Sequence, residues 1–498
     1  MINNVSEERI RLIFGLKLRH ARIDKKLSLS ELADRAGLSV SYLNEIEKGK
    51  KYPKTDKITL LANALDTDYD SMVSLKLPKP LAPIATLLTS NFLDEIPLAV
   101  FGINTAKLVD IMSAAPAKVN AFIAAIIDIS RNYNLTQKQF LSAVSQSYQE
   151  LHENYFEELE TAADQCRAVL GWSQANLTNE QLTTALLDQY KVLIDENSLS
   201  QYPELTTFRS LFIKGKPHRL LIDRNLSAEQ KKFILAKEIG YHFLGLDLQQ
   251  RTYIYQSWVN TNTFDQALIN FKASYFAGAI QMPQAIFADD LRQWLSQTTW
   301  QPDEVLRLLK RYGVTLETFM YRLTNLLPKF LGLNQLFFIR FNHESGSDVY
   351  DLNKEIHLSQ RHNPHANKWG EHYCRRWLSI NIFQQLDTQA EGVVVAAQRS
   401  RYHDSKNEYL IISMARRVLA NPNRNVSMTI GILLNGDTKR KIKFWDCEAI
   451  RVRKVNVTCE RCSIADCESR AAEPTIYQEN QQIDRITHLI NELSAASK

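Results

Sequence analysis

The chain has 498 residues, 45% of them hydrophobic and 23% charged, so we expect a globular protein of several domains with ample buried core. Residues 1–8 are polar and no apolar run reaches the roughly 18 residues of a membrane span, which predicts a cytoplasmic protein without a signal peptide or membrane contact. Six cysteines in a chain of this length exclude a disulfide scaffold. Residues 1–57 hold 13 Lys or Arg and 8 Asp or Glu, which accounts for the whole net charge of +5 and predicts nucleic-acid contacts there.

Residues 28–51 have the pattern of two short helices joined by a tight turn. Ser28 and Glu31 have the spacing of a capping box, and Gly37 can adopt the left-handed conformation that ends a helix. Ser39 can cap the second helix. The inner stripe that we expect for this helix is Val40, Leu43 and Ile46. The alternative for this pattern is a small helical bundle with a solvated face.

The other face of the second helix carries short polar side chains at its start and lysines just beyond its end. Short polar groups suit base edges, and basic groups suit backbone phosphates. This arrangement predicts double-stranded DNA as a partner. The side chains that we expect at the DNA are Ser39, Val40, Ser41, Tyr42, Asn44, Glu45, Lys48, Lys50 and Lys51.

These two helices, with the ending IEKGKKYP, resemble the repressor-type (Xre/Cro-like) helix-turn-helix. The resemblance implies a structural pair between Arg22 on the first helix and Glu47. Because dimers of such domains place two reading helices about one DNA turn apart, we expect a pseudo-palindromic operator and a homodimer or homotetramer.

Further helices are expected over residues 9–26, 55–65 and 68–72, followed by a proline-rich linker at 77–84 and a helical region to residue 190. Residues 147–172 predict one long amphipathic helix. Its apolar positions are Leu151, Tyr155, Leu159 and Ala162, at spacings of four, four and three. Such a helix mediates a dimer or packs internally, and the pattern favours neither.

From residue 201 the pattern predicts strands as well as helices. A β-hairpin with a turn at Lys214–Pro217 is followed by a helix that contains Ala236. More helices are expected at 264–282, 285–296 and 302–326, and strands at 336–341, 393–398, 409–418, 427–434 and 441–446.

The expected fold class is therefore mixed, mainly α with an α+β carboxyl-terminal half. We assign four domains. They are a five-helix helix-turn-helix domain (1–76), a helical linker or dimerisation region (77–195), an α+β domain (196–330) and a mixed ligand-sensing domain (331–498).

Residues 237–241 occupy the place of an H-E-x-x-H motif, in which two histidines bind zinc and the glutamate acts as general base. The surrounding hairpin and helices resemble the ImmA/IrrE zinc-peptidase domain. The three positions that the resemblance implies for zinc ligands hold Lys237, Tyr241 and Lys272, which cannot replace two imidazoles and a carboxylate. Glu238 and His242 could form a weak two-ligand pair, although an ordinary polar pair is favoured. We therefore expect a scaffold without enzymatic activity.

Cys459, Cys462 and Cys467 have the spacing C-x2-C-x4-C. Three thiolates this close can bind one metal ion or cluster, with a fourth ligand from Cys374 or Cys447. The spacing does not decide between zinc and an iron–sulfur cluster, and three reduced, partly buried thiols are the alternative.

The order of these parts resembles the short-chain fatty acyl transcriptional regulator family. The segments that carry the resemblance are 154–165, 273–287, 312–326, HYCRRW at 372–377 and CERCSIADCESRAAEP at 459–474. The family implies an acyl-CoA effector and, in some members, a [4Fe–4S] cluster. By the same analogy Cys374 is the better fourth ligand, because HYCRRW falls where the family places another cysteine.

The sequence thus predicts a DNA-binding transcriptional regulator that responds to a short-chain acyl-CoA and to its cluster or redox state. One alternative is a zinc metallopeptidase that cleaves a partner repressor. Another is a phage or toxin–antitoxin repressor without a metabolite ligand.

Overall fold

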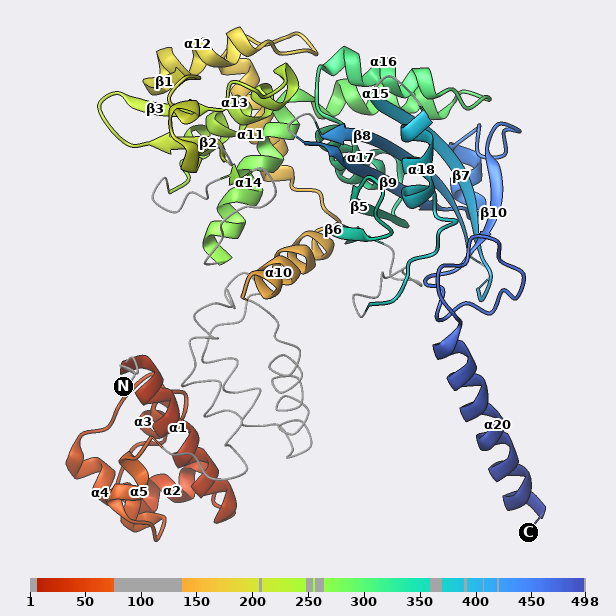
Figure 1. Cartoon of the computed structure of the whole chain (residues 1–498). Coiled ribbons are helices and arrows are strands. Elements are labelled where there is room, and N and C mark those ends of the chain that lie inside the picture. Colours follow the sequence, from red (N-terminus) through yellow and green to blue (C-terminus); the bar gives the residue numbers. More distant parts are fainter. Residues whose placement is uncertain are drawn as a thin grey trace. The chain divides into compact units, whose positions relative to one another are not determined.

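A computed structural model describes residues 7–75, 137–205, 208–247, 254–255, 264–358, 370–388, 392–405, 407–418 and 421–496 (Figure 1). The chain divides into two compact units, Met1–Ser145 with Thr261–Ala267, and Gln146–Asn260 with Leu268–Lys498, which are described one at a time. The expected linker at 77–84 and the expected helices up to residue 136 lie outside the described residues. The domain boundaries at 76, 195 and 330 stay predictions.

The described part of the first unit from residue 7 to 75 has the five helices expected from the sequence. They surround one apolar core that includes Phe14, Leu32, Leu43 and Ile46. Gly15 allows α1 to approach α3 closely, because a Cβ there would lie 2.4 Å from the Ile46 carbonyl oxygen. The helices are α1 (Glu7–Asp24), α2 (Leu29–Ala36), α3 (Val40–Glu47), α4 (Thr55–Ala64) and α5 (Tyr69–Val73).

The predicted helix caps are confirmed. Ser28 and Glu31 form a capping box, and Gly37 ends α2 at φ 62°. The Ser39 hydroxyl accepts a hydrogen bond from the Tyr42 amide at the start of α3. Val40 is exposed, so its assignment to the inner stripe is wrong, whereas Leu43 and Ile46 are buried.

The second unit begins with helices packed on a small sheet of strand order β1-β3-β2-β4. β2 and β3 form the predicted antiparallel hairpin, and β1 pairs with β3 in parallel. The helices are α11 (Glu157–Val169), α12 (Asn179–Tyr190) and α13 (Ala228–Phe243), together with α10 (Gln137–Leu151) from Gln146 on and α14 (Phe264–Gln281) from Leu268 on. Two short 3-10 turns, η3 (Leu199–Gln201) and η4 (Pro203–Leu205), follow β1. The strands are β1 (Val192–Asp195), β2 (Phe208–Ile213), β3 (His218–Ile222) and β4 (Ile254–Tyr255).

The expected continuous helix over residues 147–172 is wrong. α10 ends at Leu151 and α11 starts at Glu157, because Glu153 and Asn154 have positive φ angles of 51° and 52°. Asn154 is fully buried, and its side-chain amide donates to the Thr324 hydroxyl at 2.7 Å, so a tertiary contact offsets the broken helix. The sequence pattern left open whether this segment mediates a dimer or packs internally. Leu159 is part of a buried core, which favours internal packing.

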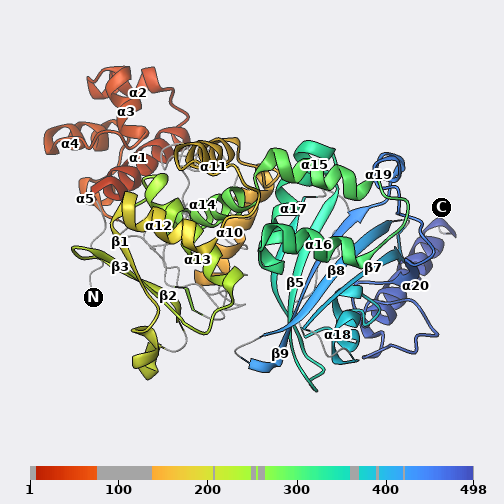
Figure 2. The same cartoon turned by 90° about the horizontal axis from the view of Figure 1, so that it is seen from above.

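The rest of the second unit is a six-stranded sheet of order β10-β7-β8-β9-β5-β6, covered on one face by α15–α17 and on the other by α18 (Figure 2). Neighbouring strands are antiparallel except β10 and β7. The helices are α15 (Gln284–Leu295), α16 (Pro302–Tyr312), α17 (Leu316–Leu331), α18 (Leu378–Thr388), α19 (Gly436–Lys441) and α20 (Thr475–Ala496). The strands are β5 (Leu336–Glu344), β6 (Tyr350–His357), β7 (Val393–Tyr402), β8 (Glu408–Val418), β9 (Asn421–Leu433) and β10 (Arg451–Val455).

Two expectations about this half are corrected. The helix expected at 302–326 is two helices, because Gly313 adopts a left-handed conformation and ends α16. Residues 441–446 are not a strand. Ile442 and Phe444 instead enter the core beside α15 as single anchors, and the Lys443 amide bonds to the Leu295 carbonyl. The fold class, mainly α with an α+β carboxyl-terminal half, is confirmed.

No helix in the described part of the chain has the length and apolar character that crossing a bilayer requires.

Candidate nucleic-acid interface and cysteine site

The face of α3 that leaves the core is polar. Ser39, Val40 and Ser41 at its start are exposed, as are Lys50 and Lys51 beyond its end. The other side chains that we assigned to DNA contact, Tyr42, Asn44, Glu45 and Lys48, are half-buried. The nine predicted DNA contacts therefore lie on one short helix and the turn that follows it.

α3 is held to α1 by a charged pair. Arg22 donates through Nε and Nη2 to the two carboxylate oxygens of Glu47, at 2.7 and 2.8 Å, and through Nη1 to the Leu27 carbonyl at 2.9 Å. The Glu47 hydrogen bond also raises the pKa of Arg22. This pair was implied by the resemblance and is confirmed. It fixes the carboxyl-terminal end of α3, so the polar face is presented rigidly.

Four of the predicted contacts are partly engaged within the domain. Lys51 forms an ion pair with Glu45 at 2.7 Å and lies over the Tyr42 ring. Its hydrogen bond lowers the pKa of Glu45. Ser39 uses its hydroxyl as the cap of α3. Ser41, Asn44 and Lys50 are therefore the better candidates for base and phosphate contacts.

The degenerate peptidase motif lies on α13. Lys237 is buried, contacts Asn270 by a hydrogen bond and lies 5.7 Å from the centre of the Tyr241 ring. Lys272 is paired with Glu158 at 3.8 Å. Glu238 contacts His242 at 3.1 Å, in the ordinary polar pair favoured by the sequence. Gly240 lets α14 pack closely, since a Cβ there would lie 2.9 Å from the Phe276 ring.

The cysteine segments come together although they are far apart in the sequence. Tyr373 and Thr458 form an antiparallel bridge, in which the Cys374 amide bonds to the Val457 carbonyl at 3.1 Å and the Cys459 amide to the His372 carbonyl at 2.8 Å. The Cys462 amide closes a turn onto the Cys459 carbonyl at 3.2 Å. Cys374, Cys459 and Cys462 are buried and Cys467 is half-buried. Cys447 packs against the core on the opposite face of the sheet.

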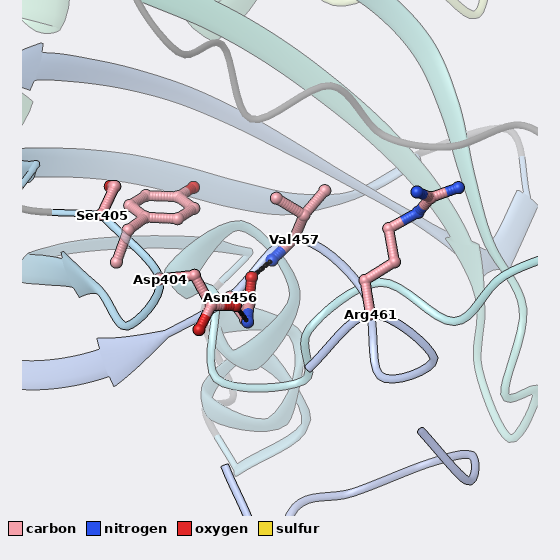
Figure 3. Close-up of a pocket in the computed structure, with 6 residues that line it drawn as sticks. Asp404, Ser405, Asn456, Val457 and Arg461 are labelled. Carbon is pink, nitrogen blue, oxygen red and sulfur yellow. Dashed lines mark hydrogen bonds between the residues drawn. The ribbon is translucent and has the colours of Figure 1, made fainter. Parts of the chain in front are cut away.

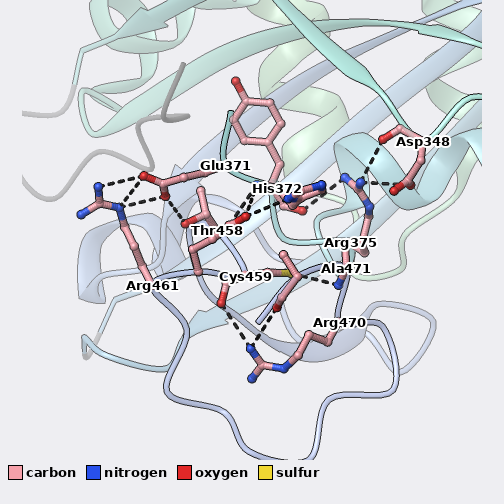
Figure 4. Close-up of polar contacts among 12 residues, drawn as sticks. Asp348, Glu371, His372, Arg375, Thr458, Cys459, Arg461, Arg470 and Ala471 are labelled. Carbon is pink, nitrogen blue, oxygen red and sulfur yellow. Dashed lines mark hydrogen bonds and ion pairs between the residues drawn. The ribbon is translucent and has the colours of Figure 1, made fainter. Parts of the chain in front are cut away.

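Charged side chains fasten these segments to each other (Figure 4). Glu371 accepts two hydrogen bonds from Arg461 at 2.9 Å and one from the Thr458 hydroxyl at 2.6 Å. Glu460 in turn contacts the ring and the backbone amide of His372, at 2.7 and 3.0 Å. No pattern in the sequence indicates these pairs, because their partners lie 87 to 90 positions apart. These contacts fix residues 372–377 beside the loop of residues 459–470, which we call the cysteine loop.

The four predicted cysteine ligands have the right chemistry for a thiolate-bound metal, but their positions match such a site only in part. The Ala471 amide donates to the Cys459 sulfur at 3.3 Å, the kind of hydrogen bond that tunes cluster thiolates. Burial raises the pKa of Cys374 to about 11, so this thiol stays protonated unless a metal ion stabilises its thiolate. Among the described residues, however, no three His, Cys, Asp or Glu side chains are placed so that they could hold a metal ion. The four-cysteine ligand set stays a prediction.

A pocket of about 270 Å³ adjoins the cysteine loop (Figure 3). Its polar wall is built by Asn456, which bonds to Asp404 and to the Val457 amide. The pocket is smaller than the roughly 300–1,000 Å³ of sites for drug-sized ligands, so it does not hold a whole acyl-CoA. The lining residues are Tyr402, Asp404, Ser405, Asn456, Val457 and Arg461.

Two segments of the chain match family models. Residues 18–71 match the helix-turn-helix family, and residues 189–324 match the IrrE N-terminal-like domain. Residues 7–75 thus form a helix-turn-helix domain of the DNA-binding class, and the sheet β1–β4 with its helices belongs to an IrrE N-terminal-like domain. The resemblances inferred from the sequence are confirmed for both domains.

Two longer similarities are to proteins named as regulators. HTH-type transcriptional regulator RamB of Mycobacterium tuberculosis is 23% identical over 338 residues, which cover 63% of this chain and 65% of RamB. The propionyl-CoA carboxylase regulator of Cereibacter sphaeroides is 23% identical over 336 residues, which cover 64% of this chain and 65% of that protein. The chain thus spans about 65% of the length of these relatives. A solved structure of a Mycobacterium tuberculosis transcriptional regulator is 19% identical, with a TM-score of 0.46, and covers 66% of this chain and 93% of that one.

Proposed function

We propose that this protein is a cytoplasmic, dimeric transcriptional regulator that binds a pseudo-palindromic operator and releases or grips it in response to a short-chain acyl-CoA. The observation that carries the proposal is the rigid presentation of the polar face of α3 by the Arg22–Glu47 pair. An effector alters DNA affinity only if it binds two states of the protein unequally. The similarity to a protein named as a regulator of propionyl-CoA carboxylase supports an acyl-CoA as the effector.

The proposal assigns no peptidase activity to the IrrE-like domain. Two ammonium groups and a phenol stand at the three positions that would bind zinc, so Glu238 has no metal-bound water to activate. Zinc bound at α13, with proteolysis of a partner repressor that is lost in Glu238→Gln, would contradict this assignment.

The base-reading role is tested by substitutions on α3 and in the turn after it. Asn44→Ala is expected to lose about 1–3 kcal/mol of preference for the operator over random DNA. Lys50→Ala is expected to weaken all sequences alike and to flatten the dependence of affinity on salt. The operator is first selected from a random pool, and affinities are then measured by fluorescence anisotropy with and without a panel of acyl-CoAs.

Lys25→Ala is the matched control for these variants, because Lys25 is also an exposed lysine of this domain but is paired with Asp66 at 2.9 Å. Equal loss on operator and random DNA for Asn44→Ala would remove Asn44 from the base-reading set. Operator affinity that no acyl-CoA changes would favour a repressor without a metabolite ligand.

The cysteine site adds a second input to the proposal. Cys374, Cys459, Cys462 and Cys467 would supply four thiolates to a [4Fe–4S] cluster or to zinc, and a cluster would supply redox sensitivity when bound. The hydrogen bond from Ala471 and the ion pairs around Glu371 would orient the ligands and cover the cluster. The loop 459–470 would then report metal loading to the strand β10 that precedes it.

Protein purified without oxygen is expected to show a broad visible absorption band that disappears in Cys459→Ser and in Cys374→Ser. Cys447→Ser is the control and should retain the band, because Cys447 packs on the opposite face of the sheet. A colourless protein with one bound zinc would leave the ligand set standing and remove the redox input. A metal-free protein would show that the cysteines serve neither purpose.

The dimer is proposed to form through α20, which is a 22-residue helix. Every residue from 478 to 495 is exposed, and these residues include five large apolar side chains. Four of these, Ile483, Ile486, Ile490 and Leu493, repeat at spacings of three, four and three, which is the a/d seam of a coiled coil. Isoleucine at both a positions with Leu493 at one d position is the pattern of two strands, whereas Ile486 at the other d position suits higher oligomers.

The occupant of this seam is proposed to be α20 of a second copy. The positions that flank the seam, Gln482, Thr487, Leu489 and Ser494, carry no charge, so two identical helices meet without repulsion. The five exposed apolar side chains, including Leu489, would bury on the order of 1,000 Å² in a pair of helices, which is about the minimum for a biological interface.

A further inference from the structure

The bend between α10 and α11 has a backbone conformation that its residues disfavour. Glu153 and Asn154 have φ angles of 51° and 52°, in the left-handed region that glycine adopts readily and that residues with a Cβ avoid. The Glu153 amide donates to the Glu150 carbonyl at 3.0 Å and the Asn154 amide to the Gln149 carbonyl at 2.7 Å, which is the Schellman pattern of a helix end. Glycine is the usual residue at the position that Glu153 holds. The bend is therefore strained, and other contacts must offset the strain.

The sequence of this segment favours a helix that continues through the bend. Leu151, Tyr155 and Leu159 recur at spacings of four, and residues 147–170 contain neither glycine nor proline. In the observed bend Leu151 is 67% exposed, whereas Leu159 is buried. A continuous helix would return Leu151 to the face that carries Tyr155 and Leu159. The local preference of the chain and its observed conformation therefore differ here.

Side chains of α17 hold the bend in place. The Asn154 side chain donates to the Thr324 hydroxyl at 2.7 Å, and the Asn154 carbonyl accepts from the Asn325 side chain at 2.7 Å. The Tyr321 hydroxyl donates to the Gln149 side chain at the end of α10. Residues three and four apart on a helix lie on one face, so Tyr321, Thr324 and Asn325 face the bend together. A shift of α17 would therefore disturb all three contacts at once.

The bend brings together aromatic rings that a continuous helix would separate. The ring centres of Tyr148 on α10 and Phe156 are 5.5 Å apart, and those of Phe156 and Phe271 on α14 are 5.0 Å apart. Residues eight positions apart in a continuous helix are separated by about 12 Å along its axis. The contact between Tyr148 and Phe156 exists only in the bent form. Bent and continuous forms are therefore two discrete arrangements and not a gradual flexing.

We propose that residues 152–156 are a two-state hinge, bent as observed or helical, whose state carries effector binding to α10. The residues of α10 up to Ser145 belong to the first unit, which contains the helix-turn-helix domain. A ligand that shifts α17 would release Asn154 and let α10 and α11 join into one helix. Such an element couples two sites because both bias one equilibrium. The inference rests on the proposed function only in taking operator affinity as the output.

Two substitutions shift the hinge in opposite directions. Glu153→Gly favours the bent form, because glycine adopts the left-handed conformation without strain and weakens a helix. Glu153 is exposed and its side chain forms no hydrogen bond or ion pair within the described part of the chain, so this variant removes no contact. Thr324→Val favours the helical form, because it removes the hydroxyl that accepts from Asn154. The ratio of bent to helical protein is expected to be about tenfold or more higher in Glu153→Gly than in Thr324→Val.

The state of the hinge is measured in the full-length protein by the separation of two spin labels. The labels are carried on noncanonical residues at Ser147 and Gln165, which are exposed, so that the cysteines stay native. A continuous helix fixes their separation at about 27 Å. Glu153→Gly supplies the separation of the bent form, and Thr324→Val is expected to add population at about 27 Å. Propionyl-CoA, used as the probe, is expected to do the same in the wild-type protein.

Operator affinity is measured by anisotropy with and without propionyl-CoA. Glu153→Gly is expected to reduce the change in affinity that the probe causes at least about fivefold, and Thr324→Val to reproduce that change without the probe. Lys191→Gly is the matched control for the first variant, because Lys191 also ends a helix in the left-handed conformation, at φ 55°. Thr429→Val is the control for the second, because Thr429 is a buried threonine whose hydroxyl contacts Ser413 at 2.7 Å. Both controls should keep the wild-type label separation and the wild-type response.

The outcomes separate the hinge from the proposed function. Label separations that follow the two variants, without any effect of acyl-CoA on operator affinity, would support the hinge and overturn the acyl-CoA effector. A response to acyl-CoA that Glu153→Gly and Thr324→Val leave intact would overturn the hinge and leave the effector standing. One label separation common to the wild type and both variants would overturn the hinge whatever the operator affinity.

Discussion

Replacement of Glu160 by glutamine is expected to lower the free energy of unfolding of the second unit by about 3–5 kcal/mol. Glu160 and Arg322 are about 1% exposed and form a two-fold hydrogen-bonded ion pair, in which Nη2 donates to Oε2 at 2.7 Å. Tyr275 donates to the same carboxylate at 2.6 Å, and Arg322 Nε donates to the Met282 carbonyl at 3.1 Å. The pair joins α11 to α17, a helix that packs on the six-stranded sheet.

The large effect follows from what the substitution leaves behind. Arg322 keeps its charge at every pH of interest, and a neutral amide cannot balance it in a buried position. Glu158→Gln is the matched control on the same helix, because Glu158 is 66% exposed and its partner Lys272 lies 3.8 Å away. The control should change the free energy of unfolding by less than about 0.5 kcal/mol. Denaturation in urea, followed by tryptophan fluorescence, measures both. Similar losses in the two variants would show that the buried pair is not special.

The double variant Ile486→Asp/Leu493→Asp is expected to convert a dimer into a monomer and to weaken operator binding by about 100-fold or more. Both substitutions place charges within the proposed seam of α20, where two like charges would face each other across the dimer. A monomer engages one half-site at a time and loses the high effective concentration that the second domain experiences in a dimer. Sedimentation velocity measures the oligomeric state, and anisotropy measures the affinity.

Gln481→Asp/His488→Asp is the matched control for the seam. It adds the same two aspartates to α20 at exposed positions on the opposite side of the helix. This control should remain a dimer and keep operator affinity. A dimer that survives the double seam variant, or a wild-type protein that is a monomer at micromolar concentration, would refute the role of α20.

The helix-turn-helix domain was predictable because its signals are local. The capping box at Ser28, the left-handed Gly37 and the Ser39 cap each depend on residues within three or four positions, and the structure has all three. The Arg22–Glu47 pair joins residues 25 positions apart and came from the resemblance, not from any pattern in the chain.

The expectations that failed concern segments whose structure depends on contacts far away in the sequence. Residues 152–156 have helical periodicity, but the buried contact of Asn154 with Thr324, 170 positions away, breaks the helix. Residues 441–446 alternate apolar and polar as a strand does, yet Ile442 and Phe444 lie in the core beside α15. Local patterns cannot report such contacts, because tertiary packing overrides weak propensities.

The sequence by itself determined the character of this protein: a reading helix with its polar face, a peptidase motif without its ligands, and cysteines at metal-binding spacing. Those features are residue types at short separations, and side-chain chemistry at short separation is set by the chain alone. Only the tertiary structure brought Cys374 to the Cys459 turn and buried Arg322 against Glu160. The first depends on how strand segments pair and the second on how helices pack, and both arise from packing over the whole unit, which no window of sequence contains.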